Sequence, residues 1–285
     1  MKNLKLAAVC LSCLTMTGCS ALNFSVEGLI NAPKLTSEQS EIHQALIESV
    51  GSNITLKYPK NGEYRSAYVI ANIDDEPTDE AMVFYEYTSN GSEEDGLRVN
   101  ILDKDEDGKW YSVKELAGAG TDIDQVIISP MGSNNQTDVF VGYQNLTNDE
   151  KTMEIYSYTD GDFKRVALDT YSVLEPLDIN NDGYIELITI QRSTNNDTGA
   201  VTAKASMLNM KNNEITRGEN VDMCDNVTSY VSSKTGMLDS GRRAIFIDGL
   251  TADGKLQTEI IYYRYSGLQN PMQLRSEKDR KSTRL

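Results

Sequence analysis

The sequence predicts an all-β protein, in which about four four-stranded blades form a β-propeller-like array after one short N-terminal helix. From Ile54 onward, short runs of Val, Ile, Tyr and Thr alternate with Asn, Asp and Gly turns, as in antiparallel strands. A unit of strand, acidic loop and strand also recurs, with loops that start at residues 72, 129, 178 and 234. A hairpin follows each unit, so every repeat has four strands, which is typical of propeller blades.

Length and charge limit the possible functions. The chain has 285 residues, enough for one large β domain or two small ones. Its formal net charge of −16 argues against nucleic acid as a partner, because phosphate binding needs clustered Lys and Arg. The same charge argues against direct attraction to an anionic lipid surface.

The N-terminal segment has the features of an export signal. Lys2 and Lys5 give it a basic start, and residues 6–16 form an apolar run. This run is too short to cross a membrane, since a spanning helix needs about 20 residues. We therefore expect residues 1–18 to be a signal peptide that is not part of the fold.

The residues that end this segment are Met16-Thr17-Gly18-Cys19-Ser20. Small residues before a cysteine at this point resemble the lipobox of bacterial lipoproteins. The resemblance implies cleavage before Cys19, a diacylglycerol on its thiol, and a location on the outer side of the bacterial cell membrane. An anchor of two or more acyl chains holds a protein stably. The alternative is an ordinary secretory signal with a chance cysteine.

The cysteine count excludes a structural disulfide within one mature chain. Cys10 and Cys13 leave with the predicted signal peptide, and the lipid occupies Cys19. Cys224 then has no partner. We expect Cys224 to be a small core residue or a shielded free thiol.

One helix is expected between the anchor and the strands. Residues 19–35 form a polar, mixed tether that would hold the domain off the bilayer. Thr36-Ser37-Glu38-Gln39 is a capping-box pattern and Gly51 would end the helix, which therefore spans residues 36–51. Its apolar positions fall on one face at helical spacing: Ile42, Ala45, Leu46 and Val50. We expect this helix to cover one end of the β domain, with the sole histidine, His43, on its solvent side.

The repeated strands extend over residues 54–274. The strand–loop–strand units are residues 67–87, 125–143, 172–191 and 229–248. The hairpins that follow are residues 97–115, 153–168, 203–221 and 258–274, the last with a strand near 272–274. Another all-β repeat architecture is the alternative to a propeller. Residues 275–285 are basic and polar, and we interpret them as a disordered tail or as non-native sequence from a truncated reading frame.

The third acidic loop, at residues 178–186, has the pattern of a cation site. Oxygen-bearing side chains stand at its positions 1, 3, 5 and 9, and Gly183 at position 6 permits a sharp turn. Such an all-oxygen, anionic set suits a hard cation such as Ca2+. An apolar strand follows this loop, whereas a helix follows the loop of an EF-hand. The predicted ligands are the side chains of Asp178, Asn180, Asp182 and Glu186 and the backbone carbonyl of Tyr184.

This loop and the strand after it resemble the FG-GAP or VCBS repeat of integrin-α-like β-propellers, and the resemblance covers roughly residues 54–274. It implies that a Ca2+-binding loop joins the first two strands of a blade. The first repeat matches only in part, since Pro77 replaces the glycine, so we expect a weaker site there. Its ligands would be Asn72, Asp74, Glu76 and Glu80. The second and fourth loops keep little of the pattern beyond Asp138 and Asp239.

Residues 103–108 also match the start of a calcium loop. Position 9 of that stretch is Tyr111, however, and an aromatic strand follows it. We interpret residues 103–108 as a charged hairpin tip.

The sequence lacks the residue sets of most catalytic sites. A single histidine leaves no Ser-His or Cys-His pair, and no G-x-S-x-G elbow, zinc cluster or phosphate-binding glycine loop occurs. The sequence does not exclude a hydrolase whose catalytic residues are all carboxylates. The repeat pattern nevertheless assigns most acids to turns and ion ligands, so we expect no enzyme activity.

Together these features predict an extracytoplasmic lipoprotein: a calcium-stabilised β-propeller scaffold, anchored to the membrane, that binds a protein or glycan ligand. Two alternatives remain. One is a carboxylate-dependent glycan-processing enzyme of the cell envelope, and the other is a structural envelope assembly factor.

Overall fold

The structure, a computed structural model, describes residues 35–88, 96–132, 137–145, 150–194, 197, 199, 201–211, 214–225 and 227–271. The chain divides into two compact units, residues 1–40 and 41–285. The predicted signal peptide, Cys19 and the predicted tail lie outside the described residues. Within the described ranges, no helix is long and apolar enough to span a membrane.

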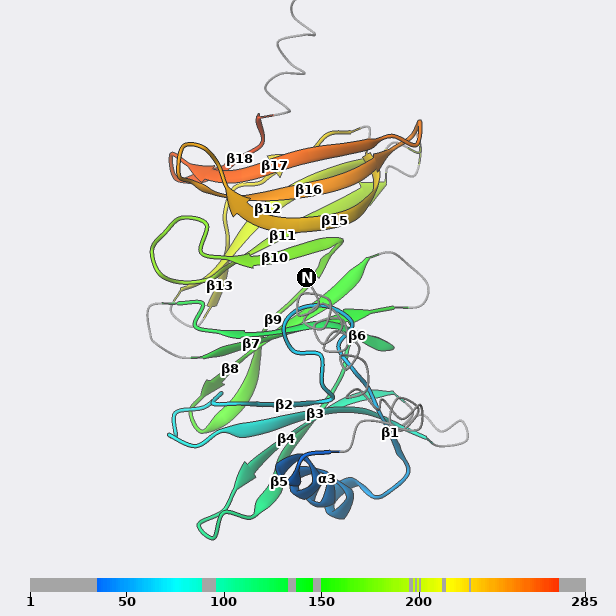
Figure 1. The fold of residues 1–285 in the computed structure, drawn as a ribbon, viewed down its shortest axis with the longest axis vertical. Helices are drawn as coiled ribbons and strands as arrows, with labels where there is room; N and C mark the ends of the chain where they lie inside the picture. Colours follow the sequence, from blue (N-terminus) through cyan, green and yellow to red (C-terminus); the bar gives the residue numbers. More distant parts are fainter. Residues whose placement is uncertain are drawn as a thin grey trace, which may run out of the picture. The chain divides into compact units, whose positions relative to one another are not determined.

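The strands form four antiparallel sheets that follow one another along the chain (Figure 1). The first sheet contains β1 (Ile54–Leu56), β2 (Tyr68–Ala71), β3 (Glu80–Tyr87), β4 (Leu97–Lys104) and β5 (Trp110–Ala117). The second contains β6 (Asp122–Ser129), β7 (Asp138–Gln144), β8 (Lys151–Thr159) and β9 (Asp162–Tyr171). The third contains β10 (Val173–Leu177), β11 (Glu186–Thr194), β12 (Val201–Lys211), β13 (Glu214–Arg217) and β14 (Val221–Asp222). The fourth contains β15 (Val227–Met237), β16 (Arg243–Thr251), β17 (Leu256–Arg264) and β18 (Gly267–Gln269).

This arrangement confirms the predicted all-β class, with four repeats of about four strands each. Most strands pair with their neighbours in sequence. In addition, β1 and β2 share one edge of β3, and β13 and β14 share one edge of β12. Among the described strands, the first sheet does not pair with the fourth, so closure into a ring is not seen in this part of the chain.

The last strand differs from its predicted position. It lies at Gly267–Gln269, whereas the strand expected near residues 272–274 falls outside the described residues. Tyr265 and Ser266 form a two-residue turn with φ values of 54° and 72°. Two consecutive positive φ angles define the type I′ hairpin turn, which usually contains Asn or Gly. A Tyr-Ser pair gives no such signal in the sequence.

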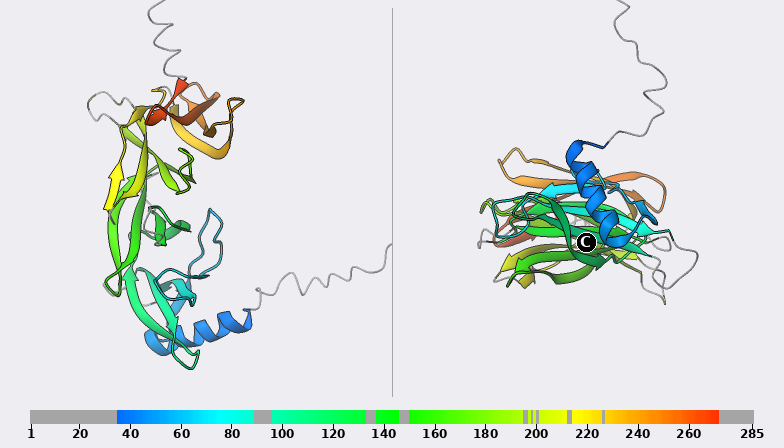
Figure 2. Two further views of the ribbon diagram at one scale, coloured as in Figure 1. Left: turned by 90° about the vertical axis from the view of Figure 1, so that its left-hand side faces the viewer. Right: turned by 90° about the horizontal axis from the view of Figure 1, so that it is seen from below.

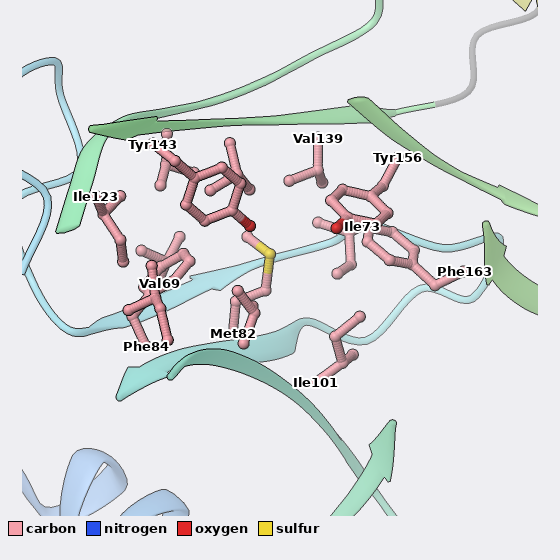
Figure 3. Close-up of a cluster of buried hydrophobic side chains, with 14 residues drawn as sticks. Val69, Ile73, Met82, Phe84, Ile101, Ile123, Val139, Tyr143, Tyr156 and Phe163 are labelled. Atoms are coloured by element: carbon pink, nitrogen blue, oxygen red, sulfur yellow. The ribbon is translucent and has the colours of Figure 1, made fainter. Parts of the chain in front are cut away.

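Consecutive sheets pack face to face through apolar side chains. Along β3, Met82 and Phe84 face the second sheet, whereas Val83 faces the opposite way, as expected from the alternation of a strand. Figure 3 displays Met82 and Phe84 with Tyr143 and Ile123 of the second sheet in one buried cluster. Comparable clusters join the second sheet to the third and the third to the fourth.

Helix α3 (Ser37–Val50) begins at the predicted capping box. The Gln39 N–H donates to Thr36 Oγ1 at 3.1 Å, and the Thr36 N–H donates to Gln39 Oε1 at 3.1 Å. Gly51 follows the helix with a φ of 86°, and its N–H bonds to the Ile47 carbonyl. The helix therefore begins and ends at its capping signals.

The apolar face of α3 packs on the first sheet, on the face that points away from the second sheet (Figure 2). Ile42, Ala45 and Leu46 are buried there. His43 does not stand free in solvent as expected. It is partly buried, and its Nδ1 lies 2.8 Å from the Tyr68 hydroxyl. The ring is thus part of the contact between helix and sheet.

Two smaller sequence predictions can be compared with the structure. Residues 103–108 form a hairpin tip between β4 and β5, in which Asp105 Oδ1 accepts the N–H groups of Asp107 and Lys109.

Cys224 is a free, partly buried thiol. Burial raises the pKa of that thiol to about 12, and the nearby Glu259 carboxylate adds to the shift.

Candidate functional site

Three of the four repeats share one buried carboxylate interaction. In each of these three repeats, the strand that follows the acidic loop (β3, β7 or β11) begins with an acidic residue. Its carboxylate accepts the backbone N–H of the residue seven positions earlier. The pairs are Glu80 with Ile73 at 2.8 Å, Asp138 with Met131 at 3.2 Å, and Glu186 with Ile179 at 3.0 Å. The second loop therefore keeps this carboxylate contact, although its sequence keeps little of the predicted calcium-ligand pattern. In the fourth repeat this position is Arg243, the first residue of β16.

The loop at residues 178–186 gathers the predicted side chains. The Asp182 N–H donates to Asp178 Oδ1 at 3.1 Å and to Asn180 Oδ1 at 2.8 Å. Asn180 Nδ2 donates to Asp182 Oδ2 at 2.9 Å and to Glu186 Oε1 at 2.8 Å. Tyr184 takes part through its N–H, which donates to Asp182 Oδ1 at 3.0 Å. The side chains of Asn180, Asp182 and Glu186 thus contact one another, and the Asp178 carboxylate joins them through the Asp182 N–H.

The donor set of this loop fits a hard cation, since it offers three carboxylates and one amide oxygen. Burial raises the pKa of Glu186 to about 7, the Ile179 N–H opposes the shift, and Asp182 and Asp178 add to it. Arg243 already contributes positive charge, because its Nη1 lies 2.9 Å from Asp178 Oδ2. Among the described residues, no group of three or more His, Cys, Asp or Glu side chains converges as a metal site. The calcium assignment therefore stays a prediction.

The first loop is held by different contacts. Asn72 Nδ2 donates to the carbonyls of Glu76 and Thr78, at 2.5 and 3.0 Å. The Glu76 N–H donates to Asp74 Oδ1 at 2.7 Å. Glu80 lies buried beneath the loop. Asn72, Asp74 and Glu76 thus contact one another within the loop, with the Asn72 amide bound to backbone carbonyls, whereas Glu80 in β3 bonds to the Ile73 N–H.

A cleft of about 590 Å3 lies along the first strands of the second, third and fourth sheets. Residues 124–128 of β6, residues 172–176 at β10 and residues 230–233 of β15 form its walls. Residues 61–64, which precede β2, and Lys151 of β8 complete it. The volume is typical of a small-molecule site.

Asp124 is the most firmly held polar group in this cleft. It is 1% exposed and is the extra residue of a β-bulge, between Ile123 and Gln125 in the pairing of β6 with β7. Its carboxylate accepts bonds from Lys151 Nζ at 2.8 Å, Asn61 Nδ2 at 2.8 Å and the Tyr171 hydroxyl at 2.6 Å. Asp124 thus organises the cleft.

Glu175 connects two walls of the cleft. Ser233 Oγ of β15 donates to Glu175 Oε1 of β10 at 2.5 Å. Burial raises the pKa of Glu175, although the bond from Ser233 opposes the shift. Val231 is the extra residue of a second bulge, between Tyr230 and Ser232, so two of the three wall strands are irregular at the cleft. Bulges are over-represented next to active sites, where they redirect a side chain.

Sequence reasoning missed this cleft. Asp124, Lys151 and Glu175 lie in three strands with no shared motif, and their proximity arises only when the sheets stack. The one available signal was an acid inside each of two first strands, Asp124 in β6 and Glu175 in β10.

Comparison with known proteins gives little further guidance. No family model matches the chain, and no curated protein matches it. Among solved structures, the chain is similar to one described as "putative exo-beta-1,3-galactanase from Bifidobacterium bifidum s17". The two share 12% sequence identity over 76% of this chain and 75% of that chain, with a TM-score of 0.28. A TM-score this low carries no argument about fold or function.

Proposed function

We propose that this protein is an extracytoplasmic glycan-binding scaffold, held at the membrane by lipid on Cys19, with the cleft as its binding site. The observation that carries the proposal is the cleft itself, which runs along three successive sheets. A repeated array that places its first strands side by side offers an extended groove, and an extended groove suits a chain of sugar units. Calcium in the loop at residues 178–186 would stabilise the third sheet.

The lining of the cleft supports a glycan rather than an anionic ligand. Among the described residues, its carboxylates are those of Glu63, Asp124 and Glu175, and its one lysine, Lys151, is already paired with Asp124. Amide and hydroxyl groups line it as well, from Asn61, Gln125, Ser172, Ser232 and Ser233. Such groups both donate and accept hydrogen bonds, as sugar hydroxyls do. Apolar side chains such as Val173 and Val231 can contact the carbon faces of a sugar ring.

Glu175→Gln tests the proposal by titration calorimetry. The probes are neutral oligosaccharides of three to six units from the glucose, galactose and N-acetylglucosamine series. We expect at least one series to bind the unaltered protein and to bind Glu175→Gln about tenfold or more weakly, because a hydrogen bond to a charged group contributes about 1.5–3 kcal/mol. Asp239→Asn removes an exposed carboxylate from the β15–β16 turn and serves as the control.

Two outcomes would count against the proposal. One is that no series binds the unaltered protein. The other is that Glu175→Gln binds as tightly as the control, which would place the ligand elsewhere.

A second function, carboxylate-dependent glycan processing, is favoured by two carboxylates in the cleft, those of Glu175 and Asp124. Burial raises the pKa of Glu175, which is the direction that a general acid requires, and Asp124 beside Lys151 would provide the second carboxylate. The two functions differ in turnover. A pure scaffold releases no shorter sugars from the bound oligosaccharide, whereas an enzyme releases them and Glu175→Gln abolishes the release.

A further inference from the structure

A second cavity, of about 220 Å3, lies between the first and second sheets, away from the cleft. Its walls come from the β2–β3 loop, from β4 and β5, and from the β8–β9 hairpin. Among the described residues, five carboxylates and one lysine line it, which gives a formal charge of −4 when all five acids are ionised. The acidic residues are Asp74, Glu76, Glu80, Asp103 and Asp162.

The lysine of this cavity is already engaged. Lys114 Nζ lies 2.5 Å from Asp162 Oδ1 and donates to the Phe163 carbonyl at 2.7 Å. The other four carboxylates therefore receive no cationic side chain from the described residues that line the cavity. Each carboxylate raises the cost of ionising the others, and an added cation would relieve that cost.

Glu80 provides a second, independent sign of a missing partner. Its side chain is 3% exposed, and Oε2 accepts the Ile73 N–H at 2.8 Å. Oε1 has no hydrogen-bond partner in the described part of the chain. A buried carboxylate oxygen without a donor is costly, so a ligand that donates a hydrogen bond there would be stabilising.

The walls favour an organic cation over a metal ion. The cavity is several times larger than the ~30 Å3 that one water occupies in the liquid. Aromatic rings also line it, including those of Tyr111, Tyr158 and Phe163. Aromatic faces attract ammonium and guanidinium groups.

We propose that this cavity binds an organic cation, an alkylammonium or guanidinium group, with Glu80 as its buried acceptor. A free polyamine or a basic side chain of a peptide can offer that chemistry. The proposal does not depend on the glycan cleft or on calcium in the loop at residues 178–186.

Titration calorimetry with three separate probes tests the proposal: spermidine, a capped tri-lysine peptide, and Ca2+. We expect spermidine or the peptide to bind at one saturable site. Binding by only one of the two identifies the source of the cation, and both results support the proposal. Glu80→Gln keeps the shape of the side chain and an acceptor for the Ile73 N–H but removes the charge, so we expect at least tenfold weaker binding.

The control again is Asp239→Asn, which removes one negative charge from an exposed turn. Comparison with this variant distinguishes binding at a defined site from the general attraction of a cation to an acidic protein. If Glu80→Gln does not fold, Asp103→Asn and Tyr111→Leu provide the test, since both change residues at the end of the β4–β5 pair. Equal affinity in these variants and in Asp239→Asn would overturn the proposal. Binding of Ca2+ that depends on Glu80, without binding of either organic probe, would also overturn it.

Discussion

Replacing Gly142 by alanine is expected to lower the free energy of unfolding by about 2–5 kcal/mol, the combined cost of an overpacked core and a lost buried hydrogen bond. Gly142 lies in β7, and a Cβ at this position would collide with the Tyr171 hydroxyl. The Tyr171 side chain extends from β9 across β8 and β7 to donate to Asp124 on β6 at 2.6 Å. Only a glycine leaves room for that crossing.

The Tyr171 ring has little freedom to move aside. It is fully buried, with its centroid 6.0 Å from that of Phe140, and Lys151 Nζ lies 5.6 Å from its centre. The added methyl group must therefore push the hydroxyl off Asp124, which is the residue that organises the cleft. We expect Gly142→Ala to weaken ligand binding at the cleft as well as stability.

Urea unfolding followed by circular dichroism measures the effect of Gly142→Ala. Gly267→Ala is the matched control, because a Cβ at that strand position meets nothing within 4 Å. Tyr171→Phe removes the colliding atom, so the double variant should lose less stability than the sum of the two single changes. A Gly142→Ala protein as stable as Gly267→Ala would contradict the proposed crossing.

Calcium is expected to raise the melting temperature. At a Ca2+ concentration 100-fold above the dissociation constant, binding to the folded state alone adds about 2.7 kcal/mol. For a domain of this size, that corresponds to a rise of about 5–10 °C. The physical reason is the crowding of Asp178, Asp182 and Glu186 in one loop. Differential scanning fluorimetry with EDTA and then with added Ca2+ measures the shift.

Asp182→Ala should abolish the calcium shift, because Asp182 contacts both Asn180 and Tyr184 within the loop. Asp239→Ala, in the turn of the fourth repeat, should leave the shift unchanged. Arg243→Gln adds a further test. Its guanidinium bonds to the Asp178 carbonyl at 2.6 Å and to the Asp178 carboxylate, and we expect its removal to increase the shift. A melting temperature that millimolar Ca2+ does not move would disprove the calcium assignment.

The sequence predicted those features that depend on neighbours along the chain. The helix, the four strand–loop–strand repeats and the gathering of Asp178, Asn180, Asp182 and Glu186 all follow from local spacing. Features that depend on stacking were missed. Asp124 reaches the cleft through a bulge, and Arg243 reaches Asp178 from the next sheet. The Tyr265-Ser266 turn was missed because its residues rarely adopt positive φ.

The most direct test of the cleft as a glycan site is amide chemical-shift mapping by nuclear magnetic resonance. Isotopically labelled protein is titrated with the oligosaccharide that binds best in the calorimetric panel. The proposal predicts the largest shifts at residues of the three cleft strands, with Gln125, Glu175 and Ser232 among them. Residues of the first sheet beneath α3 should not shift. Shifts centred on that face, or on the β8–β9 hairpin, would contradict the assignment of the cleft as the binding site.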